Sequence, residues 1–320
     1  LNENNFSVFS FASDGDPTYH TLITKNGNRW NSRKERPINN FVNNLYISDP
    51  LHIIKRGRYK LLTRNVRLLQ KDSERIQLNS NVKEILNLPT EILDCSRITK
   101  MHDDLPLKLF SLKNFDLLLQ LEMYPICAYF TPFTLLISSL SEESLNNDQR
   151  VDLLEITAYY LDFYKDLMKK SDKVCLQQGN GSCVVMFDYM MADDLISTCL
   201  SINSFINLYN GNINLNRLGS NPIEHHFGLM RLKAKFKHSF DVFIKNEFKV
   251  KLMEKIESEI VHNLVSSRRS SFGCNIFVNG EIYGSKSIFS NQDIAYSLLE
   301  KFNLTVKDLK YKLSKSESFY

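Results

Sequence analysis

The stretch from Leu45 to Leu62 constrains the fold more than any other part of the chain. It opens with Leu-Tyr-Ile, an apolar and β-prone run that predicts a short buried strand. Asp49 can then cap a helix whose first position is Pro50, because that position requires no backbone N–H group. The stretch therefore predicts a strand that runs directly into a helix, with a carboxylate at the junction.

The predicted helix carries several polar side chains on one side. Residues three and four apart are neighbours on a helix, which groups His52, Lys55, Arg56 and Tyr59. A carboxylate at the carboxyl end of a strand, beside such a group, is a common arrangement for a polar site in an α/β sheet. The same residues also fit a capped helix with a solvated basic face. Both interpretations stay open at this point.

Length and composition are those of a globular protein. The 320 residues are enough for one large or two ordinary domains, and 43% of them are hydrophobic and 24% charged. The net charge of +4 is compatible with nucleic acid binding without indicating it. Six scattered cysteines form no C-x-x-C pair, which argues against a zinc ribbon and indicates an intracellular protein. No apolar run has the length of a membrane span.

Elsewhere the sequence predicts one more strand, a long helical region and a hairpin. The strand runs from Asn5 to Ser13 and ends in the turn Asp14-Gly15-Asp16-Pro17. An Asn-Gly pair predicts a hairpin over 277–283. Helical spacing of apolar residues marks the ranges 82–88, 107–121, 124–140, 149–169, 192–209, 293–302 and 306–313. The chain is therefore expected to be mainly helical.

Two further segments carry polar side chains of interest. The basic loop 26–36 contains Trp30, which could stack on a base of single-stranded nucleic acid or pack locally. Between Leu218 and Arg231, Asn221 can cap a helix in which Glu224 occupies the third position, as in a capping box. Glu224 is thus either a structural cap or a functional acid.

Three motifs stand in a fixed order along the chain: SDGD at Asp14, DPLHIIKRGR at Asp49 and NPIEHHFGLMR at Glu224. Together they resemble the catalytic domain of P-element-like and hAT-like cut-and-paste DNA transposases. The resemblance covers roughly residues 5 to 240 and rests on these short motifs. It implies an α/β fold with an incomplete RNase H-like sheet and a large all-α insertion, predominantly helical overall.

The resemblance also implies a division of the chain. Residues 1–70 are expected to form part of the RNase H-like core, and residues 71–215 the helical insertion. Residues 216–262 would return to the core with the helix that bears Glu224. Residues 263–320 would form a carboxy-terminal tail with a hairpin and short helices.

A site of three carboxylates follows from the resemblance. Asp14, Asp49 and Glu224 are the expected catalytic residues, and Asp14 and Glu224 the expected ligands of Mg²⁺ or Mn²⁺. Hard cations prefer oxygen ligands, and two of them about 3.5–4 Å apart can activate the attacking and leaving oxygens of phosphoryl transfer. His52 and Asp16 would orient the groups around the metal ions.

Basic side chains are expected to hold the DNA backbone, a contact that gives affinity without reading sequence. These side chains are Lys55, Arg56, Arg58, Arg231 and Lys235. DNA is the expected partner, and a homo-oligomer is a further candidate. No membrane association is expected, and the expected location is intracellular, in the nucleus.

In the resembling family, the first catalytic Asp precedes three strands and a helix, and the sequence ahead of Asp14 has no room for them. Taking Asp14 as first and Asp49 as second leaves only 34 residues between them, which are basic and loop-like. We therefore expect a truncated or decayed transposase-derived domain, ancestrally a metal-dependent DNA cleavage and strand-transfer enzyme. It would need an upstream Asp for activity. The alternative is a catalytically inactive, domesticated DNA-binding or helical interaction protein.

Overall fold

The computed structural model describes about half of the chain in detail. The described residues are 10–13, 45–63, 66–67, 75–76, 78–96, 99, 102–175, 184–208, 215, 218, 276–278, 281–283 and 291–302. They are mostly helical, as expected. The helices are α2 (Pro50–Thr63), α3 (Ser80–Ile85), α5 (Asp104–Leu109), α6 (Leu112–Gln120), α7 (Tyr124–Ser141), α8 (Asn147–Cys175), α9 (Tyr189–Leu208) and α12 (Asn291–Lys301), with a 3-10 turn, η2, at Thr90–Leu93.

The described strands form three small, separate sheets. β1 (Ser10–Ser13) pairs in parallel with β2 (Leu45–Ser48). β3 (Val66–Arg67) lies between β4 (Arg75–Ile76) and β5 (Val184–Val185). β6 (Ile276–Val278) and β7 (Glu281–Tyr283) form the predicted hairpin, because Val278 pairs with Glu281 across two intervening residues. The predicted RNase H-like sheet is not assembled among the described strands and stays a prediction.

The strand and helix predicted at residues 45–62 are confirmed. β2 ends at Ser48, and α2 begins at Pro50. The carboxylate oxygen Oδ1 of Asp49 accepts hydrogen bonds from the backbone N–H groups of Leu51 at 2.8 Å and His52 at 3.4 Å. These are the bonds of a helix N-cap, so the cap interpretation of Asp49 is correct.

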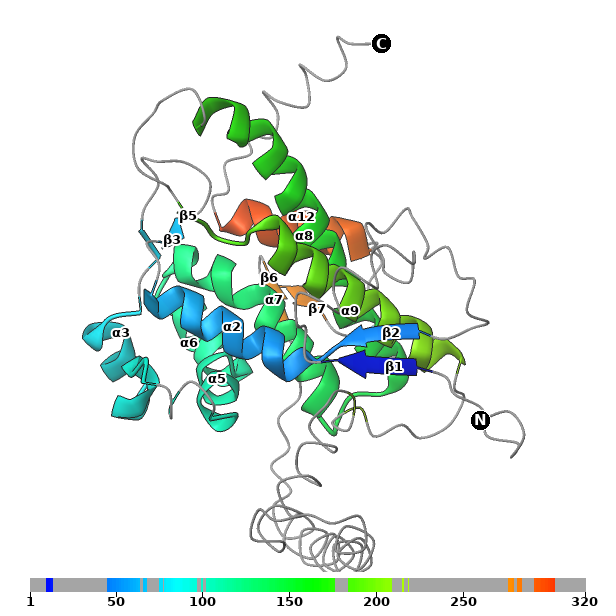
Figure 1. Cartoon of the computed structure of the whole chain (residues 1–320), viewed down its shortest axis with the longest axis horizontal. Helices are drawn as coiled ribbons and strands as arrows, with labels where there is room; N and C mark the ends of the chain where they lie inside the picture. The colour runs from blue at the N-terminus through cyan, green and yellow to red at the C-terminus, as the bar shows by residue number, and fades with distance from the viewer. Residues whose placement is uncertain are drawn as a thin grey trace, which may run out of the picture.

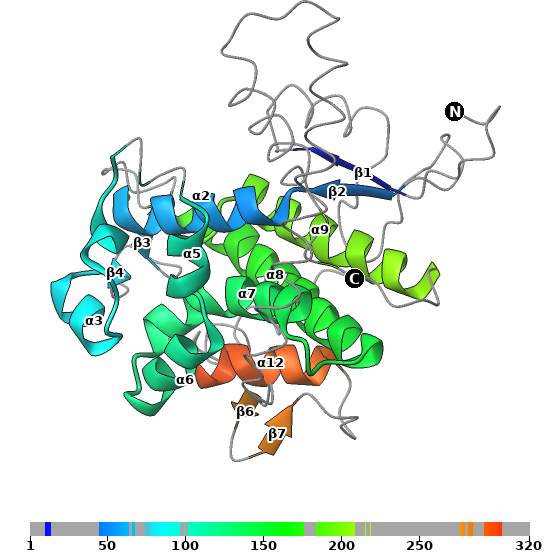
Figure 2. The same cartoon turned by 90° about the horizontal axis from the view of Figure 1, so that it is seen from below.

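The helices stack in layers behind the first two strands. Figures 1 and 2 show α2 continuing from β2 across one face of α7, α8 and α9, while α12 lies against α8 on the opposite side. The strongly apolar α7 is buried around most of its circumference. Its aromatic rings build the centre of the core: Tyr129 stacks on Phe187 at 5.2 Å, and Phe133 stacks on Phe110 at 4.6 Å between ring centroids.

A proline inside α7 is compensated by the neighbouring helix. Pro132 has no backbone N–H group, so the carbonyl of Ala128, four residues earlier, loses its helical donor. The hydroxyl of Tyr160 in α8 donates to that carbonyl at 2.8 Å, and both tyrosine and carbonyl are buried. α8 thus supplies the hydrogen bond that the sequence of α7 cannot make.

The predicted helix over 107–121 is wrong in one respect, because the structure breaks it into α5 and α6. Ser111 caps α6, its hydroxyl accepting from the N–H group of Asn114 at 3.4 Å. The break turns the chain so that Phe110 points into the aromatic core, where it is fully buried. The helix predicted over 306–313 lies outside the described residues.

The half-buried Asp116 of α6 makes the stability of the fold depend on pH. Burial raises the pKa of Asp116 from 3.8 to about 6. As the pH rises, the carboxyl group of Asp116 therefore loses its proton at a lower pH in the unfolded chain than in the folded one. The free energy of unfolding consequently falls between about pH 4 and about pH 6. Asp116→Asn is expected to raise the free energy of unfolding at pH 7 by on the order of 1–2 kcal/mol, the partly exposed side chain reducing the effect. Urea unfolding at pH 7 and pH 3.5 measures it, and a stabilisation equal at both pH values would contradict this account.

Candidate functional site

The site centres on the junction between β2 and α2. Asp49 is only 2% exposed, and Ser48 just before it is buried as well. The carboxylate caps α2 through Oδ1, so the strand end, the helix start and the acidic side chain form one rigid unit. A buried, hydrogen-bonded side chain on such a unit has a well-defined position, which a catalytic or metal-binding group requires.

β1 and β2 bring two sequence positions to the same edge. The strands are parallel and in register, with Ser13 opposite Ser48. In both strands the next residue of the sequence is an aspartate, Asp14 after β1 and Asp49 after β2. Asp14 itself lies outside the described residues. The carboxyl ends of parallel strands are where α/β proteins bind their ligands.

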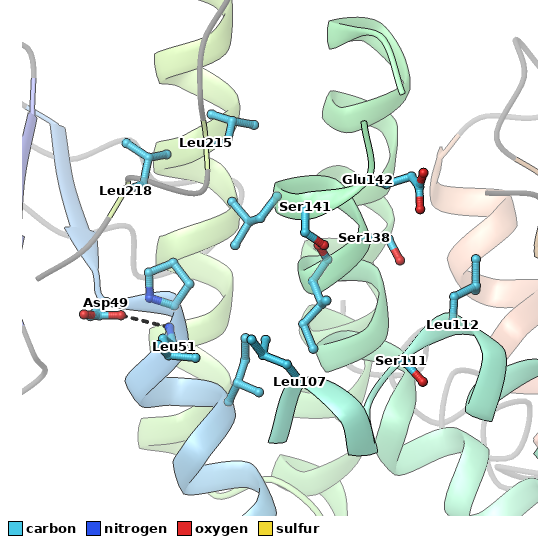
Figure 3. A pocket seen from close by; sticks show the side chains of 14 residues that line it. Asp49, Leu51, Leu107, Ser111, Leu112, Ser138, Ser141, Glu142, Leu215 and Leu218 are labelled. Atoms are coloured by element: carbon cyan, nitrogen blue, oxygen red, sulfur yellow. Dashed lines mark hydrogen bonds between the residues drawn. The ribbon is translucent and has the colours of Figure 1, made fainter. Parts of the chain in front are cut away.

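A cavity of about 500 Å³ adjoins this edge. Figure 3 shows Asp49 and Leu51 on one side of it and Ser138, Ser141 and Glu142 of the α7 end on the other. The described lining residues are Asp49, Pro50, Leu51, Ile54, Leu107, Ser111, Leu112, Ile137, Ser138, Leu140, Ser141, Glu142, Leu215 and Leu218. They include two carboxylates and no cation, so this wall favours a cation or an apolar group over a bare phosphate.

The same cavity shows where the chain returns after the helical region. Leu215 is buried, and together with Leu218 it lines the cavity that Asp49 also lines. Leu218 is six positions ahead of Glu224 in the sequence. The chain therefore comes back to the Asp49 edge shortly before the last of the three predicted catalytic residues.

The predicted DNA-binding cations of α2 have partners inside the protein. Lys55 forms an ion pair with Asp103, and the Nη2 atom of Arg56 lies 2.5 Å from the Oδ2 atom of Asp194. One turn further on, Lys60 pairs with Asp188 at 3.0 Å. This side of α2 therefore faces acidic groups of the helical region, and a fully solvated basic face is not what the structure shows.

Arg58 requires a correction to the predicted set of DNA contacts. Its side chain is 3% exposed, and its Nε, Nη1 and Nη2 atoms all donate to backbone carbonyls. The acceptors are the carbonyls of Glu91, Ile92, Asp94 and Thr99. Burial lowers the pKa of the guanidinium from its ordinary value. Arg58 thus holds the segment after α3 against α2, and its assignment to the DNA backbone is wrong.

Asp188 and Lys60 link α2 to the start of α9. The Oδ1 atom of Asp188 accepts from the N–H group of Met191 at 2.8 Å, which caps α9. Burial would raise the pKa of Asp188, but the charge of Lys60 and these hydrogen bonds lower it below its ordinary value overall. The ion pair therefore persists at neutral pH and is lost as the pH falls through that lowered pKa.

The remaining predicted site residues fall into two groups. His52 is in the first turn of α2, half-buried, with its backbone bonded to Asp49. Outside the described residues lie Asp14, Asp16, Trp30, Glu224, Arg231 and Lys235. Within the described part of the chain, no three His, Cys, Asp or Glu side chains gather as a metal site. The convergence of Asp14 and Glu224 on Asp49 therefore stays a prediction.

Sequence reasoning missed the acidic partners of α2. Asp194 is 2% exposed in α9, and Thr198 one turn later donates to the carbonyl of Ser48 at 3.4 Å. The signal was present, since Asp193 and Asp194 are the only charged residues in the sequence of this helix. A carboxylate in a buried stripe usually has a cationic partner. The sequence alone could not identify this partner as Arg56, because Arg56 is far from Asp194 along the chain.

One comparison with solved structures gives a fold likeness for this chain. Among solved structures, the chain is similar to the Drosophila P element transposase strand transfer complex, with a TM-score of 0.50 and 15% sequence identity. The match covers 79% of this chain and 61% of that chain, so this chain spans about three fifths of the transposase's length. At this identity the likeness shows the fold alone.

The other comparisons add no relative. No protein-family model matches the chain, and no curated protein matches it. Within the described residues, no helix is both long enough and apolar enough to cross a membrane.

Proposed function

We propose that this chain is a transposase-derived domain that binds DNA and carries a metal-dependent phosphoryl-transfer site, ancestral or active, at the carboxyl end of β1 and β2. The observation that carries the proposal is the parallel, in-register pairing of Ser13 with Ser48, each followed directly by an aspartate. The fold likeness to the P element transposase supports it. That structure is described as a strand transfer complex, and we therefore propose DNA as the substrate of this chain.

The pairing restricts how far apart the two aspartates can be. Neighbouring strands lie about 4.8 Å apart, and one residue advances the chain by at most about 3.8 Å. Asp14 and Asp49 each follow the last paired residue of their strand. In this proposal the two aspartates leave the sheet at the same edge and close together, which suits two carboxylates that share a metal ion.

The third carboxylate is within reach of the same edge. From Leu218, which lines the Asp49 cavity, six residues lead to Glu224. An extended chain of that length spans at most about 20 Å. The length of this segment is therefore sufficient for the proposed approach of Glu224 to Asp49.

The donor set fits a hard divalent cation. Three carboxylates are the ligands that Mg²⁺ and Mn²⁺ prefer, and the buried Asp49 is held rigidly by its cap. Bound there, the metal would neutralise charge on a phosphate and lower the pKa of an attacking hydroxyl or water. Asp14, Asp49 and Glu224 would bind and orient the ion, and the acidic cavity wall would keep an unneutralised phosphate away.

Calorimetric titration of Mn²⁺ into the full chain tests this proposal. We expect binding, with Asp14→Asn, Asp49→Asn and Glu224→Gln each weakening the affinity by about tenfold or more, because each removes a ligand. Asp104→Asn, at an exposed position of α5, is the matched control and should bind like the parent chain. Absent binding, or binding indifferent to all three changes, would overturn the proposal.

A second function has its own support. Asp49 is a helix cap, and the cations of α2 already have acidic or carbonyl partners, which fits a domain that keeps the fold without catalysis. Such a domain would still bind DNA through basic residues elsewhere, but would show no Mn²⁺ site. The calorimetric outcome therefore separates the two functions.

A further inference from the structure

We propose that Thr198 and Asp194 of α9 are positioning residues for the Asp49 carboxylate. The inference rests on the proposed function for its meaning, but its geometry is independent of any metal ion. In this arrangement α9 holds the strand end and the helix start on either side of Asp49.

The first contact fixes the end of the strand. α9 lies directly against β2, and the Oγ1 atom of Thr198 donates to the carbonyl of Ser48 at 3.4 Å. Thr198 is fully buried and Ser48 is nearly so. Ser48 is the residue immediately before Asp49, and its carbonyl belongs to the peptide unit that orients the Asp49 backbone. Loss of the hydroxyl would leave this buried carbonyl without that donor.

The second contact fixes the helix that follows. The Oδ2 atom of Asp194 lies 2.5 Å from the Nη2 atom of Arg56, two turns into α2. Asp194 and Thr198 are one turn apart and so share a face of α9. One face of α9 therefore contacts the chain both before and after Asp49.

Together the contacts determine where the carboxylate points. Asp49 keeps its side-chain conformation through the bonds from the N–H groups of Leu51 and His52. Those bonds exist only while the strand end and the helix start keep their mutual angle. A functional carboxylate must be held within about 0.5 Å of its working position. Small shifts of Ser48 or Arg56 would therefore displace the Asp49 carboxylate enough to matter.

The structure offers a matched control on the same two helices. Lys60 and Asp188 also pair α2 with the start of α9, but at the far end of α2 from Asp49. Asp188 is half exposed, and its charge also acts on Arg56, although its ion pair is with Lys60. Asp188→Asn therefore removes an ion pair between these helices, while the contacts of Thr198 with Ser48 and of Asp194 with Arg56 keep both of their partners.

The experiment compares four variants of the full chain: Thr198→Val, Thr198→Ser, Asp194→Asn and Asp188→Asn. The primary readout is amide hydrogen exchange at Leu51 and His52, whose N–H groups report the cap directly. We expect exchange at least about fivefold faster in Thr198→Val and Asp194→Asn, as cap bonds of about 1 kcal/mol are lost. Thr198→Ser, which keeps the hydroxyl, and Asp188→Asn should exchange like the parent chain.

Mn²⁺ titration is the second readout. Groups that orient metal ligands typically alter affinity by about 10- to 100-fold when removed, so Thr198→Val and Asp194→Asn should bind about tenfold more weakly. Unchanged exchange at Leu51 and His52 in both variants, or equal loss in Asp188→Asn, would overturn the positioning role. If the cap responds as expected and no variant nor the parent binds Mn²⁺, the positioning role stands and the proposed function fails.

Discussion

Replacing Arg58 with methionine is expected to lower the free energy of unfolding by about 3–5 kcal/mol. The change leaves the buried carbonyls of Ile92 and Thr99, and the partly buried carbonyls of Glu91 and Asp94, without their charged donor. Each unsatisfied buried acceptor costs about 1–3 kcal/mol, partly recovered by local rearrangement. Urea unfolding followed by circular dichroism measures the loss.

Two further variants sharpen this result. Arg58→Lys is expected to recover little, because a compact ammonium group cannot span four carbonyls as the guanidinium fork does. Lys113→Met, at an exposed position of α6, changes the same kind of charge and should stay within about 0.5 kcal/mol of the parent. A loss below about 1 kcal/mol for Arg58→Met would show that the carbonyls find other donors, and that Arg58 is free for another role.

Gly57→Ala is expected to destabilise the fold by about 1–3 kcal/mol, although alanine favours helices. A Cβ atom at Gly57 would clash with the Cζ atom of Phe133, whose ring is fully buried in the aromatic core. The hydroxyl of Tyr129 also donates to the Gly57 carbonyl at 2.8 Å, so α2 cannot simply retreat from α7. Thermal unfolding measures the loss.

An increase in stability on Gly57→Ala is the outcome that would contradict this account. At an open helical position, Gly→Ala stabilises by about 1 kcal/mol. A gain in stability would therefore mean that Phe133 moves aside at no cost. Adding Phe133→Leu to Gly57→Ala should restore part of the loss, and the difference from additivity measures the contact between the two side chains.

The sequence predicted those helices, strands and turns that are determined by residues close together in the chain. Asp49-Pro50 at the start of α2, the long apolar spacings of α7 and α9, and the Asn-Gly hairpin were all readable, because caps, periodicity and turns involve neighbouring residues. The break between α5 and α6 was readable in principle, since Ser111 caps the second helix, but the apolar period continues across it. The two-residue strands β3, β4 and β5 carry too little sequence for any pattern.

The candidate site was predictable only in part. The acidic junction at Asp49 follows from the sequence, but the fate of the nearby cations does not, because it depends on residues far away. Arg56 meets Asp194, 138 positions later, and Arg58 meets the carbonyl of Ile92, 34 positions later. A basic helix face looks the same in sequence whether its charges meet DNA, water or the rest of the protein.

The bond from Tyr160 to the Ala128 carbonyl ties two positions of the sequence together. While residue 132 is proline, the Ala128 carbonyl has no helical donor and relies on the hydroxyl of Tyr160. A related chain could replace the proline first and then the tyrosine at little cost in stability. In the reverse order, the intermediate chain would have a buried Ala128 carbonyl without a hydrogen-bond donor. In related chains we therefore expect replacement of Pro132 to precede replacement of Tyr160.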